Sequence, residues 1–176
     1  DTNTATYTLY IRKKSNNANI ASVTANPDDA DIKYSSSITE TITKSTVEGE
    51  ETVNTDYEAF RVFIPEREAT AAYYTFDLEF ELDDANAVIT SIDNKEYSLT
   101  SEGKAKITLT KSQTDYSYSG NGNDSFLIPV VAKSQSGNTK TYYVIVTPTD
   151  MNLTLTVSYG DEKVSKSENS DDYLVY

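Results

Sequence analysis

Residues 73–82 read YYTFDLEFEL, the clearest strand signal in the chain. Apolar and polar side chains alternate strictly along this stretch. The apolar set is Tyr74, Phe76, Leu78, Phe80 and Leu82, and the opposite set contains Asp77, Glu79 and Glu81. Successive side chains of a strand point to opposite faces, so the first set is predicted to enter a core and the second to face water.

Similar stretches recur along the chain, separated by Asn, Asp and Gly, whereas helical signals are almost absent. The other predicted strands are residues 4–13, 20–25, 57–64, 87–92, 95–99, 104–110, 126–132, 142–146 and 153–159. Many short strands at about 8–12-residue spacing predict an all-β chain folded as an antiparallel β-sandwich.

Turn chemistry adds local predictions. Asp93-Asn94 is a hairpin dipeptide between two predicted strands. Residues 120–124 are predicted to be a loop, and Pro129 predicts a bulge or an edge position for its strand. Residues 32–55, which are rich in Thr, Ser and Glu, predict a weak strand or an insertion loop.

Composition excludes several kinds of catalytic site. The 176 residues contain no Cys, His or Trp. The chain therefore cannot build a thiolate or imidazole zinc site, a Cys nucleophile or a Ser-His-Asp triad. We expect no enzymatic activity and no organic cofactor.

The formal charge of −13 bears on partners. It disfavours nucleic acid and anionic membranes, whose recognition needs clustered Lys and Arg. No run approaches the roughly 18 apolar residues of a membrane span, so membrane insertion is not expected. The chain begins at Asp1 without Met, which suggests that a signal peptide has been removed, and we expect a secreted, extracellular protein.

A similar sequence motif occurs near both ends of the chain. Residues 6–11 read TYTLYI and residues 141–146 read TYYVIV, with Tyr7 and Tyr142 separated by 135 positions (142 − 7). Two further echoes match NIASV at 19–23 with NLTLTV at 152–157, and Asp56-Tyr57 with Asp172-Tyr173. We interpret the chain as a tandem array cut out of phase. Residues 1–19 would hold a closing strand and linker, residues 20–148 a whole sandwich, and residues 149–176 the first strands of another.

Residues 55–148 resemble the bacterial cadherin-like β-sandwich repeat. The motifs that carry this resemblance are YEAFRVFIP at 57–65, DDANAV at 83–88, IPVV at 128–131, Gly137-Asn138, and TYYVIV at 141–146. NANI at 17–20 looks like the linker between such repeats. The resemblance implies an Ig- or cadherin-like sandwich, to which the unmatched ends of this chain would add exchangeable terminal strands.

Asp and Asn residues on predicted loops are candidate calcium ligands, because Ca²⁺ prefers oxygen donors. They are Asp28, Asp29, Asp31, Asp83, Asp84, Asn123 and Asp124. None follows the EF-hand spacing, and an acidic chain produces such clusters as solvated turns, the interpretation that we favour.

Two other patterns have a structural alternative. Glu79 and Glu81 are spaced like a glycosidase pair, but strand alternation explains them as a water-facing surface. Tyr116 and Tyr118 could form a sugar-binding platform, although tyrosine also suits strands and interfaces.

The first predicted strand, residues 4–13, resembles a closing strand, but the repeat that it would close lies outside this chain. Leu9 and Ile11 need cover, and the backbone of residues 4–13 needs partners. The strand would either fold back onto its own domain or insert into a neighbouring subunit, where it would pair with residues 153–159 or 174–176. The residues of this assembly hypothesis are Tyr7, Leu9, Ile11, Leu153, Leu155, Val157, Leu174 and Tyr176.

Together these features favour an extracellular structural or adhesive surface protein. Its identical subunits or modules would join head to tail, and β-strand addition between them would build a filament. The alternative is a non-catalytic β-sandwich module that binds a glycan or a cell surface.

Overall fold

The computed structural model describes residues 7–26, 37–48, 50–67, 72–100, 105–120, 123–149, 164–166 and 173–175. The first strands are β1 (Ile20–Ala25), β2 (Ile38–Glu48), β3 (Glu51–Pro65), β4 (Tyr73–Leu82), β5 (Val88–Ile92) and β6 (Lys95–Thr100). They are followed by β7 (Ala105–Ser112), the short 3-10 helix η2 (Gln113–Asp115), β8 (Tyr118–Gly120), β9 (Asn123–Lys133) and β10 (Thr139–Thr149). Two short strands, β11 (Val164–Lys166) and β12 (Tyr173–Val175), pair with each other.

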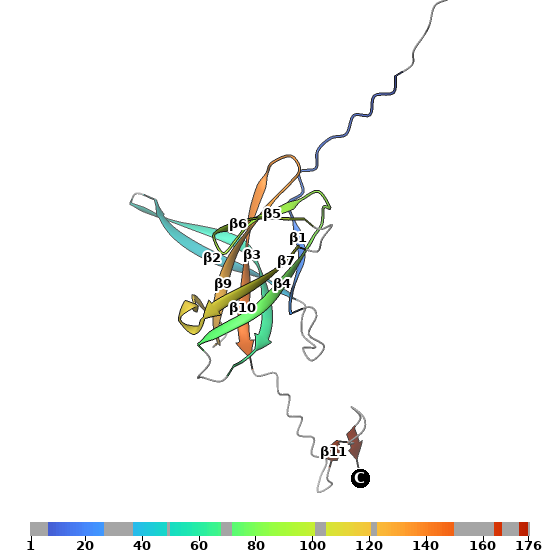
Figure 1. Ribbon diagram of the computed structural model, residues 1–176. Helices are drawn as coiled ribbons and strands as arrows, with labels where there is room; N and C mark the ends of the chain where they lie inside the picture. The colour runs from blue at the N-terminus through green and yellow to red at the C-terminus, as the bar shows by residue number, and fades with distance from the viewer. Residues whose placement is uncertain are drawn as a thin grey trace, which may run out of the picture.

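The strands from β1 to β10 form two sheets that lie face to face (Figure 1). The smaller sheet has the order β1-β4-β7, and the larger has the order β2-β3-β10-β9-β5-β6, with β8 also paired to β9. All pairings are antiparallel except that of β3 with β10. The predicted all-β sandwich is confirmed.

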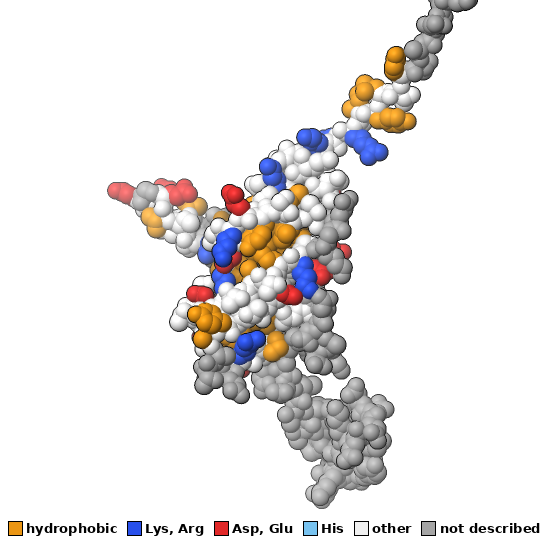
Figure 2. Space-filling model, viewed as in Figure 1, with side chains coloured by type: hydrophobic (Ala, Val, Ile, Leu, Met, Phe, Trp, Pro, Cys, Tyr) orange, Lys and Arg blue, Asp and Glu red, His pale blue; other side chains and the backbone are white. Residues whose placement is uncertain are grey.

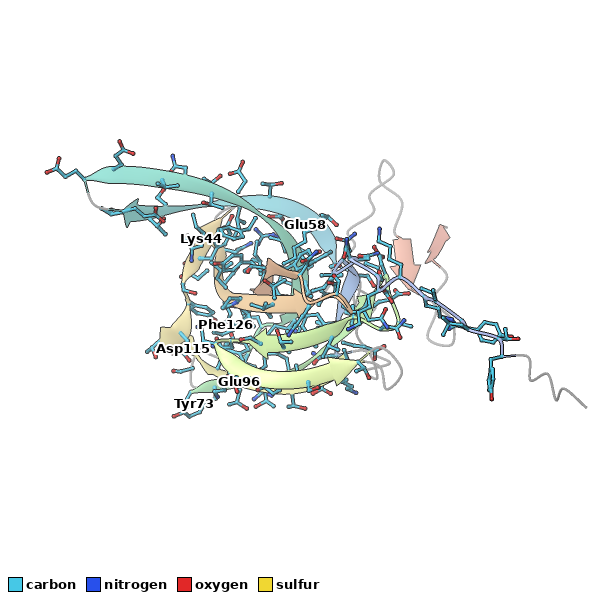
Figure 3. All side chains as sticks on the ribbon, turned by 90° about the horizontal axis from the view of Figure 1, so that it is seen from above. Lys44, Glu58, Tyr73, Glu96, Asp115 and Phe126 are labelled. Carbon is cyan, nitrogen blue, oxygen red and sulfur yellow. The ribbon has the colours of Figure 1, made fainter. Side chains whose placement is uncertain are left out.

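The core lies between the two sheets and draws on both of them. β4 contributes Tyr74, Phe76, Leu78, Phe80 and Leu82, as its alternation predicted, and each is at least nine-tenths buried. Phe126 of β9, labelled in Figure 3, enters from the larger sheet and stacks on Phe76 with ring centroids 6.0 Å apart. Phe60, Tyr142 and Val144 extend this core along β3 and β10.

The parallel pairing places two sequence motifs side by side. β10 runs beside β3 from Tyr143, opposite Ala59, to Thr149, opposite Pro65. β10 also pairs with β9 on its other side, so the TYYVIV motif is an interior strand of the sheet.

The turn predicted at Asp93-Asn94 is confirmed. β5 and β6 form a hairpin through Asp93 (φ 53°) and Asn94 (φ 61°), and this left-handed pair is the conformation that tight hairpins prefer. Gly137 (φ 102°) sits in the turn between β9 and β10.

Pro129 predicts a bulge or an edge position, and the edge is wrong, because β9 lies between β10 and β5. The register irregularity of the β5–β9 pairing lies on β5 between Ile89 and Ser91, opposite Ala132 and Val131 rather than at Pro129. The carbonyl of Pro129 accepts from the Asp93 N–H (2.9 Å), just beyond the last paired residue of β5. In a strand, the backbone N and O of one residue point toward the same neighbouring strand, so the N of Pro129 also faces β5. It does so where β5 ends, and the missing N–H of Pro129 therefore removes no hydrogen bond from the β5–β9 pairing.

The loop predicted for residues 120–124 is also wrong in part. Gly120 pairs with Asn123, and the two residues between them lie outside the described residues. This short β8–β9 hairpin was hidden because Ser119, Asn123 and Asp124 carry no apolar alternation.

The Thr/Ser/Glu-rich region forms β2 and the first part of β3 rather than an insertion loop, although its residues 32–36 and 49 lie outside the described residues. β2 pairs with β3 from Ile38, opposite Arg61, to Glu48, opposite Glu51. Residues 43–48 and 51–56 are exposed and form a two-stranded ribbon that projects beyond the sandwich (Figure 1). We call this projection the β2–β3 ribbon.

The half-buried strand predicted for residues 4–13 is wrong for the part that is described. Residues 7–13 form no strand, their side chains are exposed, and they project away from the sandwich (Figure 1). The alternating pattern correctly identifies an apolar face on residues 7–13, but no described strand of this chain packs against that face.

Candidate assembly surfaces

Residues 7–14, here called the N-terminal segment, carry a dense group of exposed apolar side chains. Tyr7, Leu9, Tyr10 and Ile11 are all between 82% and 90% exposed. Arg12, Lys13 and Lys14 follow directly and are exposed as well. The segment therefore combines a strand-like apolar face with a basic end.

The segment leaves the sandwich from a fixed point. The Ser15 carbonyl accepts from the Ser136 N–H (3.0 Å), in the turn between β9 and β10. Three residues on, Ala18 is buried, and its carbonyl accepts from the Tyr142 hydroxyl (3.4 Å). The same hydroxyl lies 3.3 Å from the Ile20 N–H, so the core strand β10 holds the chain that follows the segment.

The β2–β3 ribbon is the second projection with exposed apolar side chains. Val47 is 75% exposed and Val53 37%. Of the eight large hydrophobic side chains exposed in the described part of the chain, four lie on the N-terminal segment and two on this ribbon. The other two are Ile38, at the start of β2, and Tyr73 of β4. Exposed apolar area is thus concentrated on the two projections.

The charges of the two projections are opposite. Glu48, Glu50 and Glu51 are exposed at the end of the ribbon. Figure 2 shows acidic side chains at this end and basic side chains at the base of the N-terminal segment.

A second apolar cluster anchors the ribbon to the outer face of the larger sheet. Its buried members are Ile42, Ala59 and Ile145. Tyr57, Tyr118, Leu127 and Tyr143 pack against them. The rings of Tyr57 and Tyr143 meet edge to face at 5.2 Å, and the Lys44 ammonium lies 5.1 Å from the Tyr143 ring. The base of the ribbon is therefore packed, whereas its end is not.

Arg61 joins three strands beside this cluster. It is 5% exposed, donates to the Glu40 carboxylate of β2, and donates from Nη1 to Thr147 Oγ1 of β10 (2.8 Å). The hydrogen bond to Glu40 raises the pKa of Arg61, and its guanidinium lies 5.7 Å from the Tyr118 ring. The only sequence signal of this group is an Arg within the apolar run of 57–65, and no spacing pattern links it to Glu40 or Thr147.

The two tyrosines of the predicted sugar platform do not form one surface. Tyr116 packs on Phe126, with ring centroids 4.6 Å apart, and loss of solvation raises its pKa. Tyr118 joins the outer cluster beside Arg61.

The carboxylates of β4 engage in cross-strand contacts on the outer face of the smaller sheet. Asp77 accepts from Thr108 Oγ1 (2.6 Å) and lies 3.3 Å from the Lys106 ammonium. Glu81 accepts from Ser22 Oγ (3.0 Å). These contacts fit the predicted water-facing surface.

The calcium candidates fall into three places. Asp28, Asp29 and Asp31 lie outside the described residues. Asp84 accepts from the Asn86 N–H (2.8 Å) within a turn that follows Asp83. Asn123 and Asp124 lie exposed at the start of β9.

Within the described residues, no group of three or more Asp, Glu, His or Cys could hold a metal ion. No helix in the same part of the chain is long and apolar enough to cross a membrane.

The C-terminal members of the assembly hypothesis stay predictions. Leu153, Leu155, Val157 and Tyr176 lie outside the described residues. Leu174 lies in β12 opposite Ser165, and only its backbone is described.

Comparisons with known proteins add no family to this picture. A scan against models of protein families finds no match. Searches of curated proteins and of solved structures find no significant match either.

Proposed function

We propose that this chain is an extracellular structural or adhesive module, and that the N-terminal segment joins it head to tail to another copy by strand addition. One observation carries the proposal. A segment with the alternation of a half-buried strand lies outside every described sheet, with Leu9 82% and Ile11 86% exposed.

The relation to β10 supports a role as an added strand. The sequence motif of residues 6–11 is repeated at residues 141–146, of which residues 143–146 pair on both sides within the larger sheet. Burying a Leu or Ile side chain contributes about 1.5–3 kcal/mol, so covering this face favours association. Extended segments commonly bind by adding a strand to an open sheet edge.

We also propose that the sandwich is related to the bacterial cadherin-like repeat. The support is the parallel pairing of β3 with β10, which joins the opening motif at 57–65 to the closing motif at 141–146. Absence of Cys and His from the whole chain agrees with a structural rather than a catalytic role.

A pair of matched variants tests the assembly proposal. Sedimentation velocity over a wide concentration range should show the native chain associating beyond its monomer mass of 19.5 kDa. Leu9→Asp should stay monomeric, because it places a charge on the apolar face. Thr8→Asp adds the same charge to the opposite face and should still associate. Circular dichroism should show that both variants are folded.

A native chain that remains at monomer mass at every concentration would contradict the proposal. Binding of such a monomer to a glycan array would instead favour the module that recognises a glycan or a cell surface.

A further inference from the structure

The assembly surfaces themselves identify an acceptor for the N-terminal segment. We propose that residues 7–14 of one copy pair with the free edge of β2 on the β2–β3 ribbon of another copy. This inference rests on the proposed function and names the surface that receives the strand.

The edge of β2 can accept a strand of this length. β2 lies at one end of the larger sheet, so its outer side pairs with no described strand. Its 11 residues span about 36 Å at roughly 3.3 Å per residue, whereas the eight residues of the segment span about 26 Å. The acceptor edge is therefore longer than the strand that it would receive.

The ribbon would gain a partner that it needs. Beyond Ala59, toward the ribbon's end, β3 no longer pairs with β10, so the only described strand pairing of residues 43–48 and 51–56 is that of β2 with β3. The contact of Lys44 with the Tyr143 ring lies at the ribbon's base rather than at its end. A two-stranded ribbon is only marginally stable in water, and a third strand completes a more stable sheet. With the basic end of the segment near Glu48, Leu9 and Ile11 would extend the face of the sheet that carries Ile42, while Thr8 and Tyr10 would share the face of Thr41 and Thr43.

Charge sets the direction of the added strand. Arg12, Lys13 and Lys14 lie at the C-terminal end of the segment, and Glu48, Glu50 and Glu51 lie at the end of β2 and the start of β3. The two charge groups meet only if the segment runs parallel to β2. Complementary charges of this kind favour one register and accelerate encounter.

The two projections lie on the same chain but diverge from the sandwich: Figure 1 shows one pointing to the upper left and the other to the upper right, and in Figure 3 they leave on opposite sides. The segment therefore meets the ribbon of a second copy rather than its own. Because the donor and acceptor surfaces differ, the contact is heterologous and can propagate along a row of copies.

Exchanging the charges tests the acceptor. One variant of the full chain carries Arg12→Glu, Lys13→Glu and Lys14→Glu, and another carries Glu48→Lys, Glu50→Lys and Glu51→Lys. Each variant alone should associate at least about tenfold more weakly than the native chain in sedimentation velocity at low salt. An equimolar mixture should regain association, because the reversed segment of the first variant matches the reversed ribbon of the second.

A control variant distinguishes the effect of the ribbon's charges from the effect of net charge. Glu66→Lys, Glu96→Lys and Asp124→Lys change the formal charge by the same amount at exposed sites outside the ribbon, and this variant should associate like the native chain. The inference is overturned if the ribbon variant associates normally or if the mixture fails to regain association. If Leu9→Asp nevertheless abolishes association, the proposed function stands and the acceptor lies elsewhere. A native chain that never associates removes both.

Discussion

Arg61 shows how a single residue fixes the base of the ribbon. Its guanidinium is buried on the outer face of the larger sheet, where a charge without a partner would be costly. Glu40 of β2 supplies the opposite charge, and Thr147 of β10 accepts a further hydrogen bond from Arg61. The sequence marked Arg61 as a polar residue in an apolar strand, but Glu40 is its partner only because β2 folds beside β3.

Replacing Glu40 by Gln should therefore destabilise the chain. The change leaves the buried Arg61 charge poorly compensated, and we expect a loss of about 1–3 kcal/mol in urea unfolding. Glu58→Gln is the matched control, because Glu58 pairs with Lys140 at an exposed site. Exposed pairs contribute less than about 1 kcal/mol, so equal losses for the two variants would contradict the role of Arg61.

Asp77 links stability to pH. The hydrogen bond from Thr108 and the nearby Lys106 ammonium lower the pKa of Asp77 below its ordinary value of 3.8. Since the folded pKa lies below the unfolded one, the stabilisation is present above the unfolded pKa and is lost as pH falls through the folded pKa. Asp77→Asn should thus be less stable than the native chain at pH 7, with the difference shrinking in acid.

Thr108→Val removes the hydroxyl that donates to the Asp77 carboxylate. The stability difference between this variant and the native chain should therefore also shrink in acid. Thr110→Val is the control, since the Thr110 hydroxyl contacts Thr75 rather than a carboxylate. Chemical unfolding from pH 3 to 7 measures all three variants. A constant difference between Asp77→Asn and the native chain across that range would refute the linkage.

At the level of elements, the sequence predicted strands whose burial differs between faces. β4 and the β5–β6 hairpin could be predicted because alternation and an Asp-Asn turn specify them locally. The β2–β3 ribbon could not be outlined, because its exposed Thr, Ser and Glu residues carry no burial pattern. Its register depends on β3 and on the cluster around Ile42, which are contacts distant from the ribbon's end.

The division of β4 into two faces predicts unequal mutational costs. Phe80→Ala should lower the free energy of unfolding by about 3–5 kcal/mol, because it leaves a cavity between the sheets. Glu81→Gln, on the exposed face, keeps an acceptor for Ser22 and should change stability by less than about 0.5 kcal/mol. Denaturant titration compares the two, and a larger loss for Glu81→Gln would reverse the assignment of faces.

At the level of the whole molecule, the sequence predicted the sandwich but not the position of its first predicted strand. Alternation shows that Leu9 and Ile11 need cover, yet it cannot say which sheet supplies the cover. The exposed β2 edge was equally hidden, because residues 32–55 gave no clear strand pattern. Both halves of the proposed contact therefore emerged only from the arrangement of the sheets and the two projections.

The direction of the added strand can be measured by disulfide trapping. The chain has no natural Cys, so a mixture of two single-Cys variants has no background from native thiols. Thr8→Cys or Tyr10→Cys would mark the segment, and Thr41→Cys, Thr43→Cys or Ser45→Cys would mark β2. A disulfide needs Cα atoms about 4.4–6.8 Å apart, which restricts trapping to residues opposite each other.

If the segment runs parallel to β2, moving the Cys from position 8 to position 10 should move the best partner two residues further along β2. An antiparallel strand would move it two residues back, since the pairing order reverses. Cross-linked dimers are scored by non-reducing electrophoresis, with the Glu48→Lys, Glu50→Lys and Glu51→Lys background as the control that should trap poorly. A backward shift would refute the charge-set direction, and equal trapping at every position would show collision rather than a paired strand.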